Sequence, residues 1–336
     1  MKVSSEGSVR VDLLGGTLDL NPINIILENV VTINVATSLK AKVTIESSEK
    51  DGVELESIDY GNRFYFSKKD FTPEKLRGDH FGPMKFVCQI LDYLELKNKV
   101  KITLESGSPP GAGLGGSSAM GVTLYSAIKK FRGEDLERMT AIKEVNAIEA
   151  RILDAGPAGY QDYYPALFGG VLALTPNPSG VEVEQLYSDE LKQFLENHLT
   201  LVYSGQTRLS GINNWEVYKK FFDKVALTRE GLEEIARLSF QAYEALMAGN
   251  LSQLLELISL EGESRKNLFP GILSSSMSDL HSVLQGIDPS IGLKVCGAGG
   301  GGCFLLVHQA DKKEAIKKAV DNARMKILKF EVERPL

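Results

Sequence analysis

A glycine-rich loop between a predicted strand and a predicted helix places the strongest constraint on this chain. Residues 101–132 have the sequence KITLESGSPPGAGLGGSSAMGVTLYSAIKKFR, in which alternating apolar residues up to Leu104 predict a strand and apolar residues from Leu124 to Phe131 recur at helical spacing. Such a loop offers backbone N–H groups and the positive end of a helix dipole to an anion, most often phosphate. An ordinary strand-to-helix turn needs fewer glycines, so we expect a phosphate-binding loop here.

Length and composition favour a two-domain globular protein. The chain has 336 residues, of which 43% are hydrophobic and 24% charged. A net charge of −6 gives no reason to expect a nucleic-acid partner, so any phosphate site must be local. No apolar run approaches the ~18 residues of a membrane span.

The cysteines indicate where the protein works. Cys88, Cys296 and Cys303 are an odd number without metal-ligand spacing, which favours a reducing compartment. We therefore expect a cytoplasmic protein, as a monomer or homodimer, with no nucleic-acid or membrane partner.

The chain order predicts two domains. A strand over 171–174 is followed by Pro176 and Pro178, so we expect an N-terminal domain over 1–175 that contains the glycine loop and a C-terminal domain over 176–336. Residues 30–39 and 41–47 are predicted to be two strands of a hairpin. Residues 325–332 are predicted to be a final strand.

Two glycine runs match the pattern G-x-G-x-x-G, at 111–116 and again at 297–302. A dinucleotide-binding fingerprint requires strand, turn and helix, followed by a second strand. The first run is followed by two predicted helices in succession, through Leu153, and the second by a strand. No Lys-Ser or Lys-Thr pair follows either run, so the Walker pattern fails too. Serines stand where the helix begins, and a serine hydroxyl there can coordinate Mg²⁺ on a nucleotide.

Four charged residues each have a functional and an ordinary interpretation. Arg10 and Asp12 project from the same side of a strand over 8–14, as a site pair or as a surface ion pair. Glu149 lies at the margin of an apolar helix stripe, as a metal ligand, as the partner of an arginine or at the surface. Asp162 lies in an aromatic loop and either serves the chemistry or caps a short helix.

Three motifs in the same order resemble those of the GHMP kinases, which include galactokinases, homoserine kinases and mevalonate kinases. They are SVRVDLLGGTLDL at 8–20, PPGAGLGGSSA at 109–119 and KVCGAGGGGCFLLV at 294–307. Within the family, the chain looks most like the sugar-kinase branch around D-glycero-D-manno-heptose 7-phosphate kinase. GYQD at 159–162, YSGQTR at 203–208 and SRKN at 264–267 carry that closer likeness.

The resemblance implies an α+β fold of two domains. The N-terminal domain would resemble the second domain of ribosomal protein S5, with a left-handed βαβ unit that holds the nucleotide. The C-terminal domain would be ferredoxin-like. The implied activity is transfer of the γ-phosphoryl group of ATP, with Mg²⁺, to a sugar or sugar phosphate.

The resemblance also implies roles for individual residues. Asp162 matches the catalytic base and Arg10 the residue that orients it and stabilises the transferring phosphoryl group, while Ser117 and Glu149 match the Mg²⁺ ligands. The nucleotide loop corresponds to Pro110, Gly111, Ala112, Gly113, Leu114, Gly115, Gly116, Ser117 and Ser118. The substrate-binding set comprises Gly16, Thr17, Asp19, Gly299, Gly300 and Arg208, with Lys266 as a further candidate for a substrate phosphate.

Departures from the family pattern leave the substrate open. Leu18 stands before Asp19 where sugar kinases usually have a threonine, and Gly116 replaces the first serine of the loop. A kinase of another small alcohol, of the mevalonate or galactose type, is one alternative, and a catalytically silent ligand-binding regulator is another. A nicotinamide dehydrogenase would need the βαβ unit that the sequence lacks.

Overall fold

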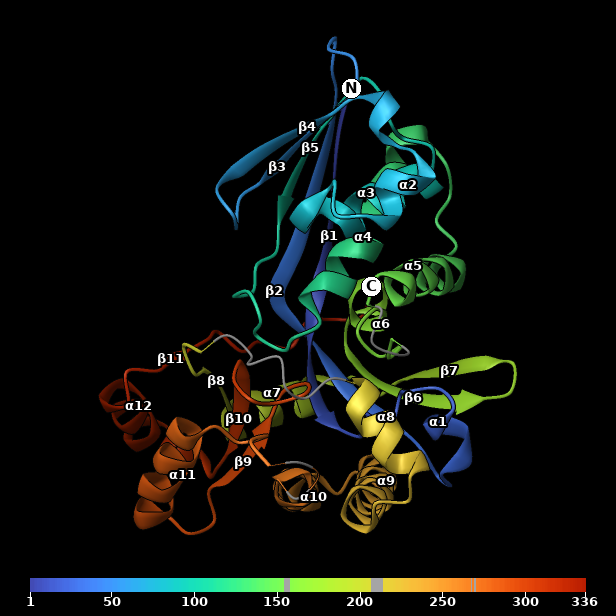
Figure 1. The fold of residues 1–336 in the computed structure, drawn as a ribbon. Helices are drawn as coiled ribbons and strands as arrows, with labels where there is room; N and C mark the ends of the chain where they lie inside the picture. Colours follow the sequence, from blue (N-terminus) through green and yellow to red (C-terminus); the bar gives the residue numbers. More distant parts are fainter. Residues whose placement is uncertain (154–157, 207–213, 267, 269) are drawn as a thin grey trace.

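The computed structural model describes residues 1–153, 158–206, 214–266, 268 and 270–336 and has an α+β architecture built on two sheets (Figure 1). The larger sheet belongs mainly to the first half of the chain. The smaller one belongs to the second half.

Two long antiparallel strands, β1 (Lys2–Leu14) and β2 (Thr32–Ser47), form the centre of the larger sheet. The strand order is β4-β3-β5-β2-β6-β7, and β1 pairs with β2 outside this path. The other strands are β3 (Val53–Ser57), β4 (Asn62–Phe66), β5 (Val100–Glu105), β6 (Val171–Asn177) and β7 (Gly180–Gln185).

The hairpin predicted over 30–47 is wrong, because β2 runs without interruption from Thr32 to Ser47. Lys40, between the two predicted strands, has no turn chemistry, and β1 supplies the partner that the hairpin would have provided. β1 pairs with β2 from Lys2 opposite Glu46 to Leu14 opposite Ile33, with register shifts near Arg10 and near Leu14.

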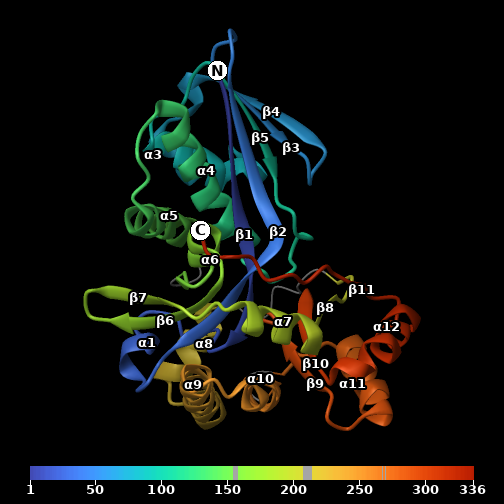
Figure 2. The ribbon, with the colours of Figure 1, turned by 180° about the vertical axis from the view of Figure 1, so that it is seen from behind.

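The predicted helices after the glycine loop are confirmed as α4 (Gly116–Arg132) and α5 (Arg138–Leu153). Together with α3 (Lys85–Tyr93) they lie on one side of the larger sheet, as the two opposite views show (Figures 1 and 2). Their apolar faces contribute Leu91, Leu124 and Val145 to the main core. Short helices complete this half: α1 (Ile23–Ile26), α2 (Pro73–Arg77) and α6 (Tyr164–Phe168).

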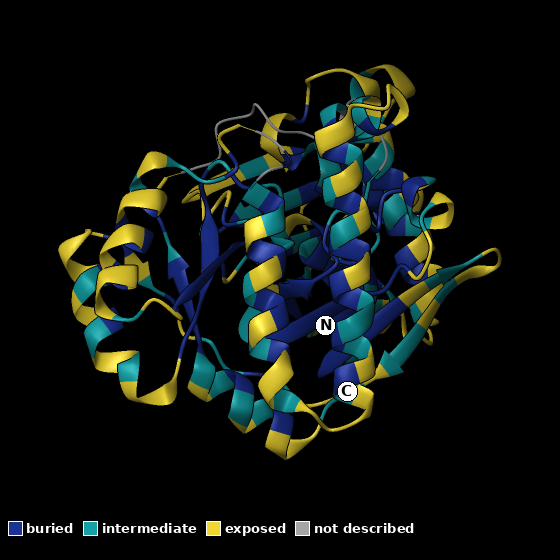
Figure 3. Cartoon of the chain, turned by 90° about the horizontal axis from the view of Figure 1, so that it is seen from below, coloured by how far each residue is buried: buried dark blue, intermediate teal, exposed yellow. Residues whose placement is uncertain are grey.

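The smaller sheet is antiparallel and has the order β11-β8-β10-β9. Its strands are β8 (Leu199–Tyr203), β9 (Gly292–Val295), β10 (Cys303–Val307) and β11 (Lys326–Ile327), the last much shorter than the predicted strand over 325–332. The helices of this half are α7 (Asp189–His198), α8 (Asn214–Phe222), α9 (Ala226–Met247), α10 (Leu251–Lys266), α11 (Ser275–Ile287) and α12 (Lys313–Asn322). The helices expose one face and bury the other, as the burial colours show (Figure 3). Within the described ranges, no helix is long and apolar enough to cross a bilayer.

The two halves are interleaved at the larger sheet. Strand β7 pairs with β6, so this sheet continues past the predicted division at residue 175. The last residues of the chain also return to it: Ser38 N donates to Glu331 O at 3.0 Å, and Glu333 N donates to Ala36 O at 2.9 Å. Residues near the end of the second half therefore form hydrogen bonds with the larger sheet of the first half.

Close packing of α10 on β9 gives a stability prediction. A Cβ at Gly262 would lie 2.3 Å from Leu293 O, so Gly262→Ala should force the helix and strand apart and destabilise the protein by about 1–3 kcal/mol. At Gly286, in α11, an added Cβ would have no other atom within 4 Å. Gly286→Ala should therefore leave stability unchanged or raise it by up to about 1 kcal/mol. Urea unfolding of both variants tests this, and equal effects would contradict it.

Candidate active site

The glycine loop reaches α4 through Gly115, whose left-handed backbone (φ 69°) would be strained for most other residues. A Cβ at Gly115 would lie 3.0 Å from the Cβ of Asp162, so the loop and the 159–163 segment touch at this point. Glycine is therefore required here both by conformation and by space. The start of α4 is held directly beside Asp162.

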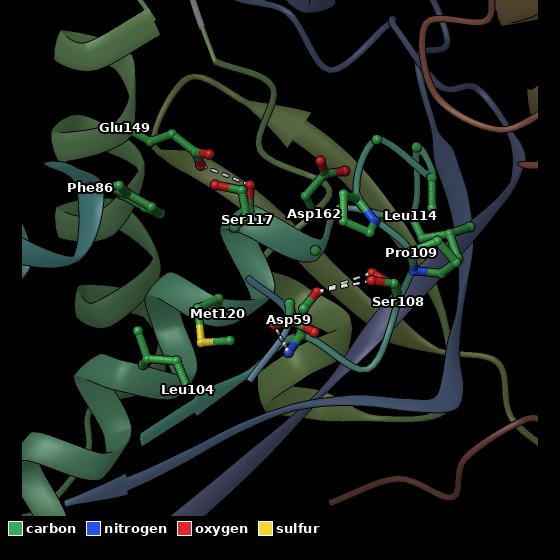
Figure 4. Close-up of a pocket in the computed structure, with 18 of the residues that line it drawn as sticks. Asp59, Phe86, Leu104, Ser108, Pro109, Leu114, Ser117, Met120, Glu149 and Asp162 are labelled. Carbon is green, nitrogen blue, oxygen red and sulfur yellow. Dashed lines mark hydrogen bonds between the residues drawn. The ribbon is translucent and has the colours of Figure 1, made fainter. Parts of the chain in front are cut away.

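A cavity of about 480 Å³ extends from this contact. Its lining includes the whole predicted nucleotide loop, 110–118, and also Arg10, Glu149 and Asp162. In Figure 4, Glu149 and Ser117 point toward one another, Asp162 lies beside the start of α4, and Met120 lies further along the cavity. The apolar part is lined by Met84, Phe86, Val87, Leu104 and Met120, with Asp59 and Tyr60 nearby. The cavity thus combines an apolar chamber, a helix N-terminus and a charged end.

Arg10 and Asp162 form an ion pair at the charged end. Arg10 Nη2 lies 2.6 Å from Asp162 Oδ1, and Arg10 Nε donates to the same oxygen at 2.8 Å. Arg10 Nη1 donates to Gly113 O at 2.6 Å, and the Arg10 backbone N donates to Leu114 O at 3.0 Å. One arginine therefore fixes the glycine loop and the carboxylate relative to each other.

The Arg10 side chain is buried, whereas that of Asp162 is partly exposed to the cavity. The Arg10 side chain is 4% exposed and that of Asp162 is 27% exposed. Burial disfavours the charged guanidinium, but the attraction of Asp162 and Asp12 raises the pKa of Arg10 overall. The interpretation of Arg10 as part of a surface ion pair is wrong. The helix-cap interpretation of Asp162 is also wrong, because α6 begins after Tyr163 without a side-chain cap.

Glu149, on α5, is 8% exposed, which excludes a surface position. Its Oε2 accepts hydrogen bonds from Ser118 Oγ at 2.7 Å and from Tyr163 Oη at 2.6 Å. Burial raises the pKa of Glu149, although hydrogen bonds from Tyr163, Ser118 and Ser117 act in the opposite direction. The carboxylate is therefore held by hydroxyl groups rather than by a cation.

This donor set fits Mg²⁺ bound mainly through a nucleotide. Among the described residues, no group of three or more His, Cys, Asp or Glu side chains gathers as a metal site. Magnesium in proteins commonly takes one or two carboxylates and fills its other positions with substrate phosphates and water. Glu149 and Ser117, which line the same cavity as the glycine loop, supply that kind of partial site.

Asp19 lies on the turn that follows β1 and is 4% exposed. Its carboxylate accepts from Gln161 N at 3.1 Å and from Gln161 Nε2 at 3.3 Å, so it is tied to the residue before Asp162. Burial and then the charge of Asp162 raise the pKa of Asp19 to about 6. Two carboxylates from distant parts of the sequence are thus brought together.

Four buried charges beneath this turn were not predicted as a group. Lys294 Nζ, on β9, lies 3.1 Å from Asp12 Oδ2 and 3.4 Å from Glu261 Oε2. Arg265 Nη2 lies 2.7 Å from Glu261 Oε1 and 3.8 Å from Asp12 Oδ2. We call Asp12, Glu261, Arg265 and Lys294 the buried tetrad; their side chains are at most 2% exposed. The available signals were a lysine within an apolar strand and an i,i+4 Glu–Arg pair on α10.

The remaining predicted site residues have other surroundings. Gly300 N donates to Ile272 O at 2.7 Å and Gly299 packs against the same residue, and neither lines the cavity. Lys266 Nζ is 2.5 Å from Glu263 Oε1. Arg208 lies outside the described residues.

The second glycine run packs onto the first. Cys303 N donates to Ala112 O at 2.7 Å, and a Cβ at Gly302 would lie 2.7 Å from Gly111 O. The two runs that share a pattern in the sequence therefore form one contact.

Comparison with protein families finds two matching models. The model described as "GHMP kinases N terminal domain" matches residues 84–170, and the model described as "GHMP kinases C terminal" matches residues 242–327. Together they cover about half of the chain, and each matched range contains one of the two glycine runs.

Two curated relatives are similar along most of the chain. The L-fucokinase/L-fucose-1-P guanylyltransferase of Bacteroides fragilis is 25% identical over 335 residues, covering 92% of this chain but only 35% of the relative. The chain therefore spans about a third of that protein. The mevalonate kinase of Saccharolobus solfataricus is 24% identical over 298 residues, covering 88% of this chain and 87% of the relative.

Solved structures share the fold. A D-glycero-D-manno-heptose 1-phosphate kinase from Bacteroides thetaiotaomicron has a TM-score of 0.76 at 20% identity, covering 100% of this chain and 97% of that one. The galactokinase of Lactococcus lactis, solved with galactose, has a TM-score of 0.75 at 14% identity, covering 100% and 95%. The predicted α+β fold of two domains is confirmed by this likeness.

The raised pKa of Asp19 gives a pH-dependent prediction. The ordinary pKa is near 3.8 and the folded value about 6, so the stability that protonated Asp19 contributes is full below pH 4 and is lost as the pH rises through 6. Asp19→Asn, which cannot ionise, should gain stability relative to the natural protein by about 2–3 kcal/mol between pH 4 and pH 8. Urea unfolding across this range measures the difference.

Asp70→Asn is the control with the opposite sign. Lys75 lowers the pKa of Asp70 to about 2 from an ordinary value of 3.8, so this variant should lose stability relative to the natural protein as the pH rises from 2 to 4, with little change above. A constant free-energy difference between Asp19→Asn and the natural protein would contradict the assignment.

Proposed function

The chain belongs to the GHMP kinase family, and from this premise we propose that it transfers the γ-phosphoryl group of ATP to a hydroxyl group of a free sugar. The observation that carries the proposal is the Arg10–Asp162 pair at the end of a cavity lined by the glycine loop. Phosphoryl transfer depends on alignment and charge stabilisation more than on covalent chemistry by the protein. This cavity supplies both.

The nucleotide phosphates would bind at the start of α4. Backbone N–H groups at a helix N-terminus and the helix dipole favour a multiply charged anion. Magnesium, held by Ser117 and Glu149, would neutralise charge on the phosphates. The apolar chamber around Phe86 and Met120 is suited to the adenine ring of the nucleotide.

Asp162 is proposed as the general base and Arg10 as the group that orients it. The partly exposed carboxylate can accept the proton of a sugar hydroxyl that approaches within hydrogen-bond distance. Arg10 is bound at once to this carboxylate and to Gly113 O, so its positive charge lies between the base and the phosphate loop. There it can stabilise charge that develops on the transferred group.

The charges around Asp19 favour a neutral acceptor. Asp19 is adjacent to Asp162, and a carboxylate is a good acceptor for the hydroxyl groups of a sugar. An acceptor with its own phosphate or carboxylate would be repelled unless it met a free cation. Among the described cations here, Arg10, Arg265 and Lys294 are each paired with carboxylates, and Lys266 is paired with Glu263.

Mevalonate is the second candidate acceptor, on the likeness to a mevalonate kinase over 87% of that protein's length. A silent regulator is less consistent with a site in which Arg10, Asp162 and Glu149 are all suitably placed.

The direct test is ATP consumption with a panel of acceptors. We expect turnover with a free hexose, 6-deoxyhexose or heptose and at least about tenfold lower kcat/KM with the matching sugar phosphates and with mevalonate. Turnover with mevalonate alone would select the second candidate. Turnover with none, in the presence of Mg²⁺, would contradict the kinase proposal.

Replacement of the proposed base gives a second test. Asp162→Asn keeps the size of the side chain but removes its basicity, so kcat should fall by about 10²- to 10⁴-fold with little change in the KM for ATP. Asp321→Asn, on the exposed face of α12, is the matched control. Equal activity of the two variants would show that Asp162 is not the base.

Replacement of the proposed metal ligand gives a third test. Glu149→Gln keeps the hydrogen bonds to Ser118 and Tyr163 within reach but loses the charge, so the Mg²⁺ concentration for half-maximal rate should rise by about tenfold. Magnesium titration at fixed ATP measures this. A fall in kcat with an unchanged magnesium requirement would contradict the metal role.

A further inference from the structure

The turn that carries Asp19 depends on side chains from the other half of the chain. Arg265, on α10, donates from Nη2 to Gly16 O at 2.7 Å and from Nη1 to Thr17 Oγ1 at 3.1 Å. These residues are nearly 250 positions from Arg265 in sequence, yet both bonds fall on the first half of the turn over 15–19. Asp19 lies two residues after Thr17.

The turn has an unfavourable backbone that needs such support. Thr17 has a φ of 76°, in the left-handed region that β-branched residues rarely adopt. Residues held in such conformations persist only where surrounding structure determines them, and they gather at functional sites. The two hydrogen bonds from Arg265 are placed to hold Thr17 in this conformation.

Arg265 is itself fixed by the rest of the buried tetrad. Arg265 donates from Nη2 to Glu261 Oε1 at 2.7 Å and from Nε to Glu261 Oε2 at 3.5 Å. Burial alone disfavours the charged form, yet Glu261 and Asp12 raise the pKa of Arg265. The arginine therefore stays charged and in place.

Asp12 supports the turn from below. A Cβ at Gly16 would lie 1.9 Å from Asp12 Oδ2, so the turn rests directly on this carboxylate. Burial tends to raise the pKa of Asp12, but Lys294 and Arg265 hold it below its ordinary value. Lys294 Nζ also donates to Asp12 O at 3.0 Å, which ties the end of β1 to β9.

We infer that Arg265 is a positioning residue, which the buried tetrad holds so that it sets the 15–19 turn and thereby aims Asp19 toward the acceptor. Asp12 and Thr17 belong to the first motif, Lys294 belongs to the third, and α10 joins them. The consequence for acceptor binding rests on the proposed function. The effect on the turn does not.

The first measurement is hydrogen exchange, which needs neither ATP nor an acceptor. Arg265→Lys keeps the positive charge but loses the fork that binds both Glu261 and the turn. Amides of residues 15–20 should exchange about tenfold faster, while those of 9–11 in β1 keep their natural rates. Arg237→Lys, which alters a similar arginine–glutamate pair on α9, is the matched control and should change neither segment.

The second measurement is rescue. Glycine adopts a φ of 76° without support. Adding Thr17→Gly to Arg265→Lys should therefore slow amide exchange at 15–20 by at least about threefold relative to Arg265→Lys alone. With an acceptor identified, Arg265→Lys should raise the acceptor KM by about tenfold and the ATP KM by less than about twofold. The double variant should recover part of the acceptor KM.

Three outcomes would overturn the inference: unchanged exchange at 15–20, uniformly faster exchange across α10, β9 and β1, or no rescue by Thr17→Gly. Should Arg265→Lys fail to fold, Thr17→Val tests the same bond from the turn. It removes the Oγ1 acceptor without leaving a charge unpaired, and it should speed exchange at 15–20 by about threefold. Natural rates in that variant would equally overturn the inference. Absence of kinase activity in the natural protein would contradict the proposed function and leave the exchange result to decide the positioning role.

Discussion

Two charges on the same side of β1 hold the site together. Arg10 binds Asp162 and the carbonyl of Gly113, while Asp12, two residues on, binds Lys294 of the smaller sheet. Side chains two residues apart on a strand point the same way. One short stretch of β1 therefore sets the distance between the glycine loop and the smaller sheet. Loss of one member of a buried, paired cluster commonly costs about 3–5 kcal/mol, so this spacing is strongly enforced.

The sequence allowed the site to be predicted where function depends on local pattern. The strand, glycine loop and helix at 100–132 follow from alternation, turn chemistry and helical spacing, and all three are present. The paired positions of Arg10 and Asp12 followed from strand geometry. The roles of Asp162, Glu149 and Ser117 came from a likeness of motifs, and they stay proposals that the geometry is consistent with.

What the sequence did not provide depends on contacts between distant segments. Tyr163 and Ser118 bind Glu149, yet neither residue type nor spacing marks a tyrosine 14 residues away as its partner. Arg265 and Glu261 resemble an ordinary surface pair on a helix until α10 is packed on β9. The predicted hairpin at 30–47 failed for a related reason: a long strand and a hairpin share the same alternation, and the pairing of β2 with β1 is not visible in the sequence.

The return of the chain's last described residues to the larger sheet has a consequence for how the protein is made. Glu331 and Glu333 bond to Ser38 and Ala36, at the centre of β2. During synthesis those positions of β2 leave the ribosome some 300 residues before their partners exist. The first half must therefore fold without the hydrogen bonds from residues 331 and 333. Pairing across such a long separation in sequence is slow. A fragment that ends after β7 would keep its strands but lack these bonds, so the two halves are better studied as one chain than as separate pieces.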